Sequence, residues 1–367
     1  MAKILAIETS CDETAAAVIE DGRKILSNII YSQADIHAIF GGVVPEIASR
    51  KHVDALDKVV DKALMDSNLS FSDIDAVAVT SCPGLVGALL TGVSYAKSLS
   101  YALSKPLISV HHIKGHIAAN YLADENFKPP FLCLVVSGGH TQIIHVKDYL
   151  SFEILAKTRD DAVGEAFDKV ARIFGLPYPG GVRVDKMAQK GDFTKMSFTK
   201  PKLDSKYDFS FSGIKTALNC YIKKIEDNNK KSVCEYKDDE PFSFESFKGL
   251  GLSVKDVKDC GICKNDVAAA FSHTVSSMLT DSFFRLAKEK NVNKVCMAGG
   301  VSANSYLRKM FFEKAEEMGL YAVCPPLSLC GDNAAMIGSQ AYYKYEKEIF
   351  SDYDLNAVPY ISVSDDI

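Results

Sequence analysis

Two pairs of short apolar runs, each interrupted by a polar turn, form the clearest pattern in this chain. The first pair lies within residues 3–20 and the second within residues 131–146. Polar residues separate the two runs of each pair, at 8–14 in the first and at 137–141 in the second. Apolar runs around a short polar turn predict a β-hairpin. Two similar hairpins far apart in the chain predict a duplicated architecture with one hairpin in each lobe.

Helical and strand-like segments alternate through the rest of the chain. Apolar strands are predicted at 74–80 and 294–298, and helices at 48–65, 87–103, 164–174, 267–289, 305–318 and 333–345. This alternation indicates an α/β fold with mixed sheets. We expect an N-terminal lobe of residues 1–112, a C-terminal lobe of residues 113–332, and a final segment, 333–367, whose helix packs back on the N-terminal lobe.

Two segments interrupt this alternation. Residues 226–264 are rich in Lys, Asp, Glu and Ser and have no steady periodicity, which predicts a surface insertion. The alternation Phe209-Ser210-Phe211-Ser212 predicts a short half-buried strand.

Composition places the chain among ordinary globular enzymes. At 367 residues, with 47% apolar and 24% charged residues, it is long enough for two lobes. It has no run of eighteen apolar residues, and its first residues lead directly into a strand, so we expect a cytoplasmic protein with no membrane span. Cysteines such as Cys82, Cys133, Cys296 and Cys324 lie in apolar surroundings and are expected to be reduced thiols. The single pair Cys260 and Cys263 is weak support for zinc.

The net charge of −5 means that an RNA partner would need a local basic patch. The best candidate patch interleaves with aromatic residues and comprises Lys195, Lys200, Lys202, Lys206 and Lys215. A ridge of small residues, Ala88, Gly92 and Ala96, lies in the helix expected within 84–103. The ridge suits close helix packing, either in the core or against another subunit.

His112 and His116 are the strongest candidates for metal ligands. On a helix, residues four apart project from one face and could share an ion. Ile113 follows His112 where a metalloprotease motif would need a Glu, so a protease is disfavoured. Asp332 could complete the ligand set, or it could cap the helix that follows it. The alternative for the two histidines is a polar role at the start of a helix.

Glycine-rich turns after buried strands suggest a nucleotide cleft between the lobes. Gly138-Gly139, Gly180-Gly181 and Gly299-Gly300 would let backbone N–H groups approach a phosphate closely. The chain contains neither a GxxxxGK[ST] nor a GxGxxG motif, which disfavours P-loop and Rossmann binding. Asp161, Glu165 and Asp168 could hold ribose hydroxyls, or they could form a solvated acidic start of a helix.

Taken in order, these segments resemble the bacterial TsaD family, tRNA adenosine threonylcarbamoyltransferases once labelled glycoproteases. The resemblance covers nearly the whole chain, and the segments that carry it are 7–14, 41–46, 111–116, 137–141, 164–169, 178–181, 209–213, 299–304 and 332–336. It implies the actin-like ATPase (ASKHA) fold, with two lobes of duplicated RNase H-like architecture and a nucleotide cleft between them. The family usually has Pro after the paired glycines, where this chain has Val182 and Arg183.

The resemblance also implies a ligand set. One divalent metal ion, Fe²⁺ first and Zn²⁺ second, would bind His112, His116 and Asp332. Threonylcarbamoyl-AMP would be held by Val135, Val136, Ser137, Gly138, Gly139, Asp168, Gly181, Asp185 and Asn304. The implied partners are tRNA, a TsaB-like paralogue and a TsaE-like ATPase, with the helix within 84–103 as a candidate subunit interface.

The implied reaction moves the threonylcarbamoyl group to the N6 amine of adenosine 37 in tRNAs that read codons beginning with adenine. Asp12 or Glu13, in the first hairpin turn, would orient or deprotonate that amine. The alternatives are a small-molecule kinase and a regulatory nucleotide-binding scaffold of the same superfamily. Neither alternative gives the paired histidines a role, so metal content would separate them from the transferase.

Overall fold

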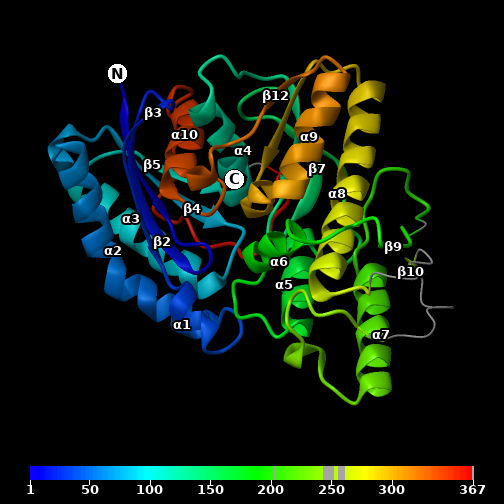
Figure 1. The fold of residues 1–367 in the computed structure, drawn as a ribbon. Helices are drawn as coiled ribbons and strands as arrows, with labels where there is room; N and C mark the ends of the chain where they lie inside the picture. Colours follow the sequence, from blue (N-terminus) through cyan, green and yellow to red (C-terminus); the bar gives the residue numbers. More distant parts are fainter. Residues whose placement is uncertain (202, 243–251, 255–260, 366–367) are drawn as a thin grey trace.

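The computed structural model describes residues 1–201, 203–242, 252–254 and 261–365, which form two sheets with helices packed around them (Figure 1). The first sheet has the order β3 (Lys24–Ser32), β2 (Glu13–Glu20), β1 (Lys3–Glu8), β4 (Ala76–Cys82) and β5 (Leu107–His111). The second sheet has the order β8 (Phe152–Lys157), β7 (Thr141–Val146), β6 (Phe131–Val136), β11 (Lys294–Ala298) and β12 (Tyr321–Val323).

The two sheets are built on the same plan. In the first, β1 pairs with β2 and β2 with β3 in antiparallel fashion, while β1–β4 and β4–β5 are parallel. In the second, β6–β7 and β7–β8 are antiparallel, while β6–β11 and β11–β12 are parallel. Both predicted hairpins are therefore confirmed, and so is the duplicated α/β architecture.

Helices cover both faces of the first sheet. On one face, α2 (Pro45–Ser67) and α3 (Val86–Leu103) bury an apolar core against the strands. On the other face lies α10 (Ala334–Tyr345), although it follows the second sheet in sequence. Gly338 allows this close approach, because a Cβ at that position would lie 2.6 Å from Cγ1 of Ile19 on β2.

Helix α4 (His112–Ala123) lies between the two sheets. Its apolar residues Ile113, Ile117 and Tyr121 pack in one core with strands of the second sheet, while its other side contacts α10. Residues 112–121 are all buried. Side chains on α4 are thus held by packing on every side, which makes this helix a rigid platform for the two histidines.

The remaining helices surround the second sheet. They share one apolar core with it, and they are α5 (Val163–Ile173), α6 (Gly181–Ala188), α7 (Ser212–Asn229), α8 (Lys264–Glu289) and α9 (Ser305–Glu317). Figure 1 shows α8 and α9 side by side at the outer side of this lobe, with α5 and α6 nearer the first lobe. Shorter elements are α1 (Ala34–Ala38), the paired strands β9 (Met196–Phe198) and β10 (Leu252–Val254), and 3₁₀ turns at Phe71–Asp73, Val233–Glu235, Gly300–Ala303 and Leu327–Leu329.

The strand expected over residues 209–212 is wrong. Phe209 forms only an isolated bridge with Thr158, and α7 begins at Ser212. Asp160 explains the difference, since its carboxylate accepts hydrogen bonds from Ser210 Oγ, Phe211 N and the Ser212 hydroxyl. These bonds bend the segment into the start of a helix while both phenylalanines stay buried.

The segment 226–264 contributes to the core where the structure describes it. Val233, Tyr236, Phe242 and Ile262 are buried against α8 and its neighbours.

Cys260 lies outside the described residues, and Cys263 is a buried free thiol at the start of α8. Every cysteine in the described part of the chain is free, and Cys82, Cys133 and Cys296 are buried as expected. Among the described helices, none is long and apolar enough to cross a membrane.

Candidate active site

His112 and His116 are positioned by the start of α4. His111 caps this helix, because its Nδ1 accepts a hydrogen bond from Ile113 N at 3.1 Å. Helical spacing then places the rings of His112 and His116 with their centroids 4.6 Å apart.

Asp332 reaches the histidines from the turn before α10. Its alternative role as a helix cap is taken by Asn333, whose side-chain oxygen accepts a hydrogen bond from Met336 N at 3.0 Å. Oδ1 of Asp332 lies 3.1 Å from His116 Nε2 and 3.6 Å from His112 Nε2. One ligand atom from each of the three residues falls within 4.8 Å of the others.

This group could bind a divalent metal ion. Both ring nitrogens of His116 are buried, and within the described residues neither makes a hydrogen bond of regular geometry. A buried polar atom with no partner is costly, and an ion between the three side chains would remove that cost for Nε2 of His116, the nitrogen nearest Asp332. Two imidazoles and one carboxylate leave coordination positions open, as in catalytic rather than structural metal sites.

Glu8, at the end of β1, fixes the orientation of His112. The Glu8 carboxylate is fully buried, and Oε2 lies 3.1 Å from His112 Nδ1 and accepts a hydrogen bond from Thr80 Oγ1 at 2.5 Å. Ser10 Oγ also lies 3.1 Å from His112 Nδ1. With Nδ1 engaged in this way, Nε2 is directed toward Asp332, the arrangement found behind many metal-binding histidines.

The sequence interpretation missed Glu8, although a charged residue closing an otherwise apolar strand was a visible signal. Burial alone would lower the pKa of His112, but the carboxylates of Asp332 and Glu8 overcome burial and raise it to about 9. Burial would raise the pKa of Asp332, yet His112 and His116 hold it well below its usual range. The charges of the group therefore compensate one another.

Asp12 and Glu13 lie beside this group, at the end of the turn that follows β1 and at the first residue of β2. Tyr178 Oη donates a hydrogen bond to Asp12 Oδ2 at 3.4 Å, and Glu13 Oε1 accepts one from Ser32 Oγ at 3.2 Å. Burial, with the nearby charges of Asp332 and Asp12, raises the pKa of Glu13 to about 9. In the metal-free protein, Glu13 is therefore a neutral carboxylic acid at pH 7.

A cavity of about 520 Å³ opens between the lobes at this point. It brings together most of the residues singled out from the sequence, and its lining includes Asp12, Glu13, Gly138, Asp168, Gly181, Asp185, Asn304 and Asp332. Val135, Val136, Ser137 and Gly139 are not part of this lining. Val135 and Val136 are fully buried in β6, and Ser137 accepts a hydrogen bond from His140 N through its hydroxyl.

Three polar residues of the lining also fix the cavity walls. Asp168 Oδ1 accepts hydrogen bonds from Gly180 N and Gly181 N, both at 3.0 Å, and so holds the paired-glycine turn. Asp185 Oδ1 accepts a hydrogen bond from Ser305 Oγ at 2.7 Å, which ties α6 to α9. Asn304 caps α9 through a hydrogen bond from Leu307 N to its Oδ1 at 3.0 Å.

The glycines of the lining leave room beside the backbone. A Cβ at Gly138 or Gly300 would have no neighbour within 4 Å, so a ligand can approach the main chain there. Gly299 has a φ of +91°, and a Cβ there would lie 2.4 Å from Val136 O. Glycine is therefore required at 299 to let the turn after β11 pass close to the end of β6.

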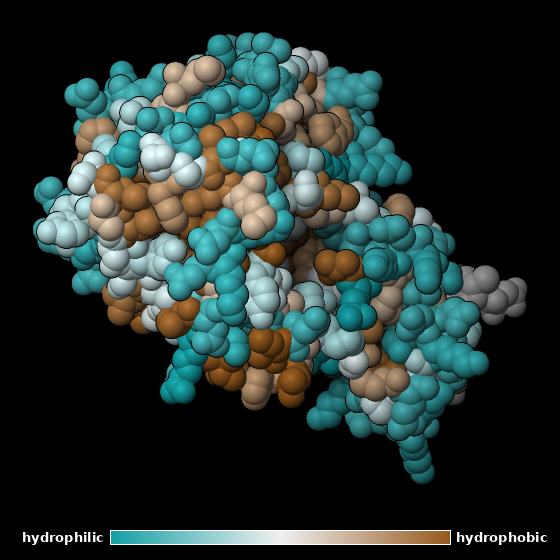
Figure 2. All heavy atoms as spheres, turned by 90° about the vertical axis from the view of Figure 1, so that its left-hand side faces the viewer, coloured by the Kyte–Doolittle hydropathy of each residue, from teal (hydrophilic) through white to brown (hydrophobic). Residues whose placement is uncertain are grey.

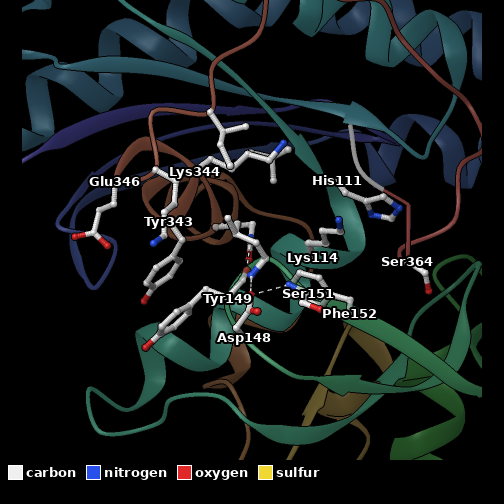
Figure 3. Close-up of a pocket in the computed structure, with 15 residues that line it drawn as sticks. His111, Lys114, Asp148, Tyr149, Ser151, Phe152, Tyr343, Lys344, Glu346 and Ser364 are labelled. Atoms are coloured by element: carbon white, nitrogen blue, oxygen red, sulfur yellow. Dashed lines mark hydrogen bonds between the residues drawn. The ribbon is translucent and has the colours of Figure 1, made fainter.

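The opposite side of α4 borders a second cavity of about 1000 Å³ (Figure 3). His111 and Lys114 point toward it, as do Tyr149 and Tyr343, which stack with ring centroids 3.8 Å apart. His111 Nε2 lies 3.3 Å from Ile361 O. Of the three histidines, His111 thus borders the second cavity, whereas His112 and His116 join Asp332.

The basic patch expected from the sequence is neutralised. Each of its four described lysines pairs with a carboxylate: Lys195 with Asp266, Lys200 with Asp281, Lys206 with Glu289 and Lys215 with Asp161. Lys202 lies outside the described residues. A surface whose cations are already paired attracts phosphates weakly.

Known proteins with matching sequences identify the family. A model of the family described as TsaD, tRNA N6-adenosine threonylcarbamoyltransferase, matches residues 24–339. The chain belongs to the TsaD family. A relative of that name from Clostridium novyi is 49% identical over 365 residues, which is 99% of this chain and 98% of the relative. A relative from Clostridium perfringens is 50% identical over 357 residues, which is 97% of this chain and 96% of the relative.

Solved structures agree with this assignment at the level of fold. HypF from T. kodakarensis aligns with a TM-score of 0.58 and 14% identity, over 96% of this chain and 49% of its own. Component A of (R)-2-hydroxyglutaryl-CoA dehydratase from Acidaminococcus fermentans aligns with a TM-score of 0.51 and 14% identity. This alignment covers 95% of this chain and 99% of the dehydratase component. The predicted actin-like ATPase fold of this TsaD-family chain is confirmed.

Proposed function

We propose that this chain transfers the threonylcarbamoyl group of threonylcarbamoyl-AMP to the N6 amine of adenosine 37 in tRNAs that read codons beginning with adenine. One observation carries the proposal: Asp332, whose carboxylate lies beside His112 and His116, lines the same cavity as the glycine turns at Gly138 and Gly300. Family membership and full-length relatives of that name support this assignment.

We assign the metal position to His112, His116 and Asp332, with Fe²⁺ as the first choice and Zn²⁺ as the second. Imidazole and carboxylate ligands suit both ions. A bound ion would supply Lewis-acid chemistry, polarising the carbamoyl carbonyl or binding the threonyl carboxylate. Glu8 keeps His112 in the orientation that such an ion requires.

The adenylate would occupy the rest of the cavity. Backbone N–H groups at the turns of Gly138 and Gly300 would stabilise its phosphate, since the space beside both glycines is open. Asp168 holds the Gly180-Gly181 turn, and Asp185 and Asn304 hold the start of α9. The cavity walls are thus set before the ligand binds, which lowers the entropic cost of binding.

In the reaction, the bond from N6 to the carbamoyl carbon forms and the bond from that carbon to the phosphate oxygen breaks. AMP leaves with the electron pair, and the amine loses one proton. We assign Asp12 as the acceptor of that proton and Glu13 as the residue that orients the amine, because both line the cavity.

A TsaB-like paralogue and a TsaE-like ATPase are the proposed protein partners, with α3 as part of an interface. The small residues Ala88, Gly92 and Ala96 are fully or largely buried in the protein's own core, so they do not form the contact surface. The outer side of α3 exposes Val86, Leu90 and Tyr101 instead. Figure 2 shows apolar groups scattered among polar ones on the side of the molecule that carries α2.

The test supplies the adenylate with a label in its threonine, together with unmodified tRNA and the partner proteins. Label should appear in a tRNA that reads codons beginning with adenine. It should not appear in the same tRNA when adenosine 37 is replaced by guanosine. A kinase would instead consume ATP with a small-molecule acceptor and leave the tRNA unlabelled. Unlabelled tRNA, with competent partners and adenylate present, would refute the proposed transfer.

A further inference from the structure

Helix α6 forms one wall of the main cavity and carries a basic outer face. Val182, Asp185 and Lys186 line the cavity. Arg183, Lys186 and Lys190 are all exposed, and their spacing of three and four residues places them on one side of the helix and its following turn. The basic face therefore starts at Lys186, on the cavity, and extends over the surface outside it.

These three cations differ from the lysines of segment 195–215. Among the described residues, no carboxylate forms an ion pair with Arg183, Lys186 or Lys190, although the chain as a whole is acidic. The carboxylate on α6 itself, Asp185, accepts hydrogen bonds from Ser305 and from Gln189 Nε2. Positive charge is thus left open to a ligand at the mouth of the cavity.

The first lobe contributes an apolar loop near the same mouth. Ile39 is 82% exposed and Phe40 57% exposed, directly after α1. The glycines that follow, Gly41 and Gly42, line a smaller cavity of about 320 Å³. That cavity shares Asp168 and Tyr178 with the main one, so the loop lies next to the catalytic cleft.

An unpaired cationic face and an exposed aromatic ring suit single-stranded RNA. Cations contact phosphates, and aromatic rings stack on unpaired bases. An adenosine that enters the cavity leaves its neighbouring nucleotides at the mouth. We propose that Arg183, Lys186 and Lys190 bind phosphates of the anticodon loop of the substrate tRNA, and that Phe40 stacks on one of its bases. This inference rests on the proposed function.

The test of the basic face uses direct binding of unmodified tRNA to the protein with the partners that transfer needs. The variant Arg183→Ala/Lys190→Ala leaves Lys186, and hence the cavity lining, intact. It should bind tRNA on the order of tenfold more weakly, and the slope of log affinity against log salt should become shallower by about 1 to 2. The adenylate should bind as in the wild type.

Two control variants isolate charge and position. Arg183→Lys/Lys190→Arg keeps both charges and should bind tRNA like the wild type. Lys288→Ala/Lys290→Ala removes two exposed lysines at the far end of α8 and should also leave affinity unchanged. Equal affinity and equal salt slope for Arg183→Ala/Lys190→Ala and wild type would refute the basic-face contact.

The stacking contact has a different signature. Phe40→Ala should weaken tRNA binding on the order of tenfold with an unchanged salt slope, because stacking releases no counterions. Phe40→Tyr keeps the ring and should restore binding. If wild type transfers the group but these variants bind tRNA normally, the inference fails and the proposed function stands. If wild type transfers nothing, the proposed function itself fails.

Discussion

Glu8 fixes the orientation of the His112 ring, because Oε2 of its carboxylate lies 3.1 Å from His112 Nδ1. The two residues come from different elements, the end of β1 and the start of α4, and both are buried. Their contact turns the other ring nitrogen toward Asp332 and His116. The proposed metal position therefore depends on how the central strand of the first sheet meets the helix between the lobes.

The first prediction concerns metal affinity. Glu8→Gln keeps the shape of the side chain but removes the charge behind His112, so affinity for Fe²⁺ or Zn²⁺ should fall by about 10- to 100-fold. Competition with a chelator of known affinity would measure the change. Glu20→Gln, at the far end of β2, is the control and should have no effect. If Glu8→Gln bound the metal ion as tightly as the wild type, Glu8 would not be the residue that orients His112.

The second prediction concerns Glu13 and pH. A carboxyl group whose pKa is about 9 in the folded state and near 4.5 when unfolded destabilises the folded state as pH rises between those values, because the unfolded state releases its proton first. Glu13→Gln should therefore stabilise the metal-free protein by about 1–2 kcal/mol at pH 8 and flatten the dependence on pH. Urea denaturation at pH 5 and pH 8 would measure this. If the unfolding free energy of Glu13→Gln depended on pH as steeply as that of the wild type, the raised pKa of Glu13 would be contradicted.

The third prediction concerns the cavity wall that Asp168 holds. Asp168→Ala removes the acceptor for Gly180 N and Gly181 N and should raise KM for the adenylate about tenfold, since hydrogen bonds to a charged group are the stronger ones. Asp168→Asn keeps an oxygen acceptor and should recover most of the loss. Equal KM values for the alanine variant and wild type would show that the turn does not depend on Asp168.

The fourth prediction concerns stability at the start of α8. Asp266 is buried and accepts hydrogen bonds from Asp192 N, Cys263 N and Lys195 Nζ. Asp266→Ala removes the acceptor of the two backbone N–H groups and the carboxylate that pairs with Lys195, and it should cost about 3–5 kcal/mol in unfolding free energy. Asp281, also on α8, is 40% exposed, and Asp281→Ala should cost about 1 kcal/mol or less. Equal losses in the two variants would contradict this ranking.

The sequence predicts most of the fold because local patterns specify most of it. Apolar runs around the polar turns at 8–14 and 137–141 gave both hairpins. The predicted helices begin and end within a few residues of the observed ones. The error at 209–212 arose because Asp160, far away in sequence, binds that segment and bends it. Alternation alone carries no information on such a partner.

Local spacing alone predicts only part of the site. His112 and His116 follow from helical spacing, whereas spacing left Asp332 open between a metal ligand and a helix cap and gave no role to Glu8, because both join the histidines through the tertiary fold. The lysines of 195–215 form a basic patch in the sequence, while the structure pairs each described one with a distant carboxylate. Charges that matter for RNA can therefore be recognised only after the ion pairs are known.

The most direct test of the central claim compares threonylcarbamoyl transfer by wild type, His112→Ala and His145→Ala. Each is given partner proteins, labelled adenylate and unmodified tRNA at saturating concentrations. His145 lies on β7 and does not belong to the group of His112, His116 and Asp332, so its variant is the control for loss of a histidine. We predict transfer by wild type and His145→Ala and none by His112→Ala. Transfer at the wild-type rate by His112→Ala, or none by wild type, would contradict the proposed site.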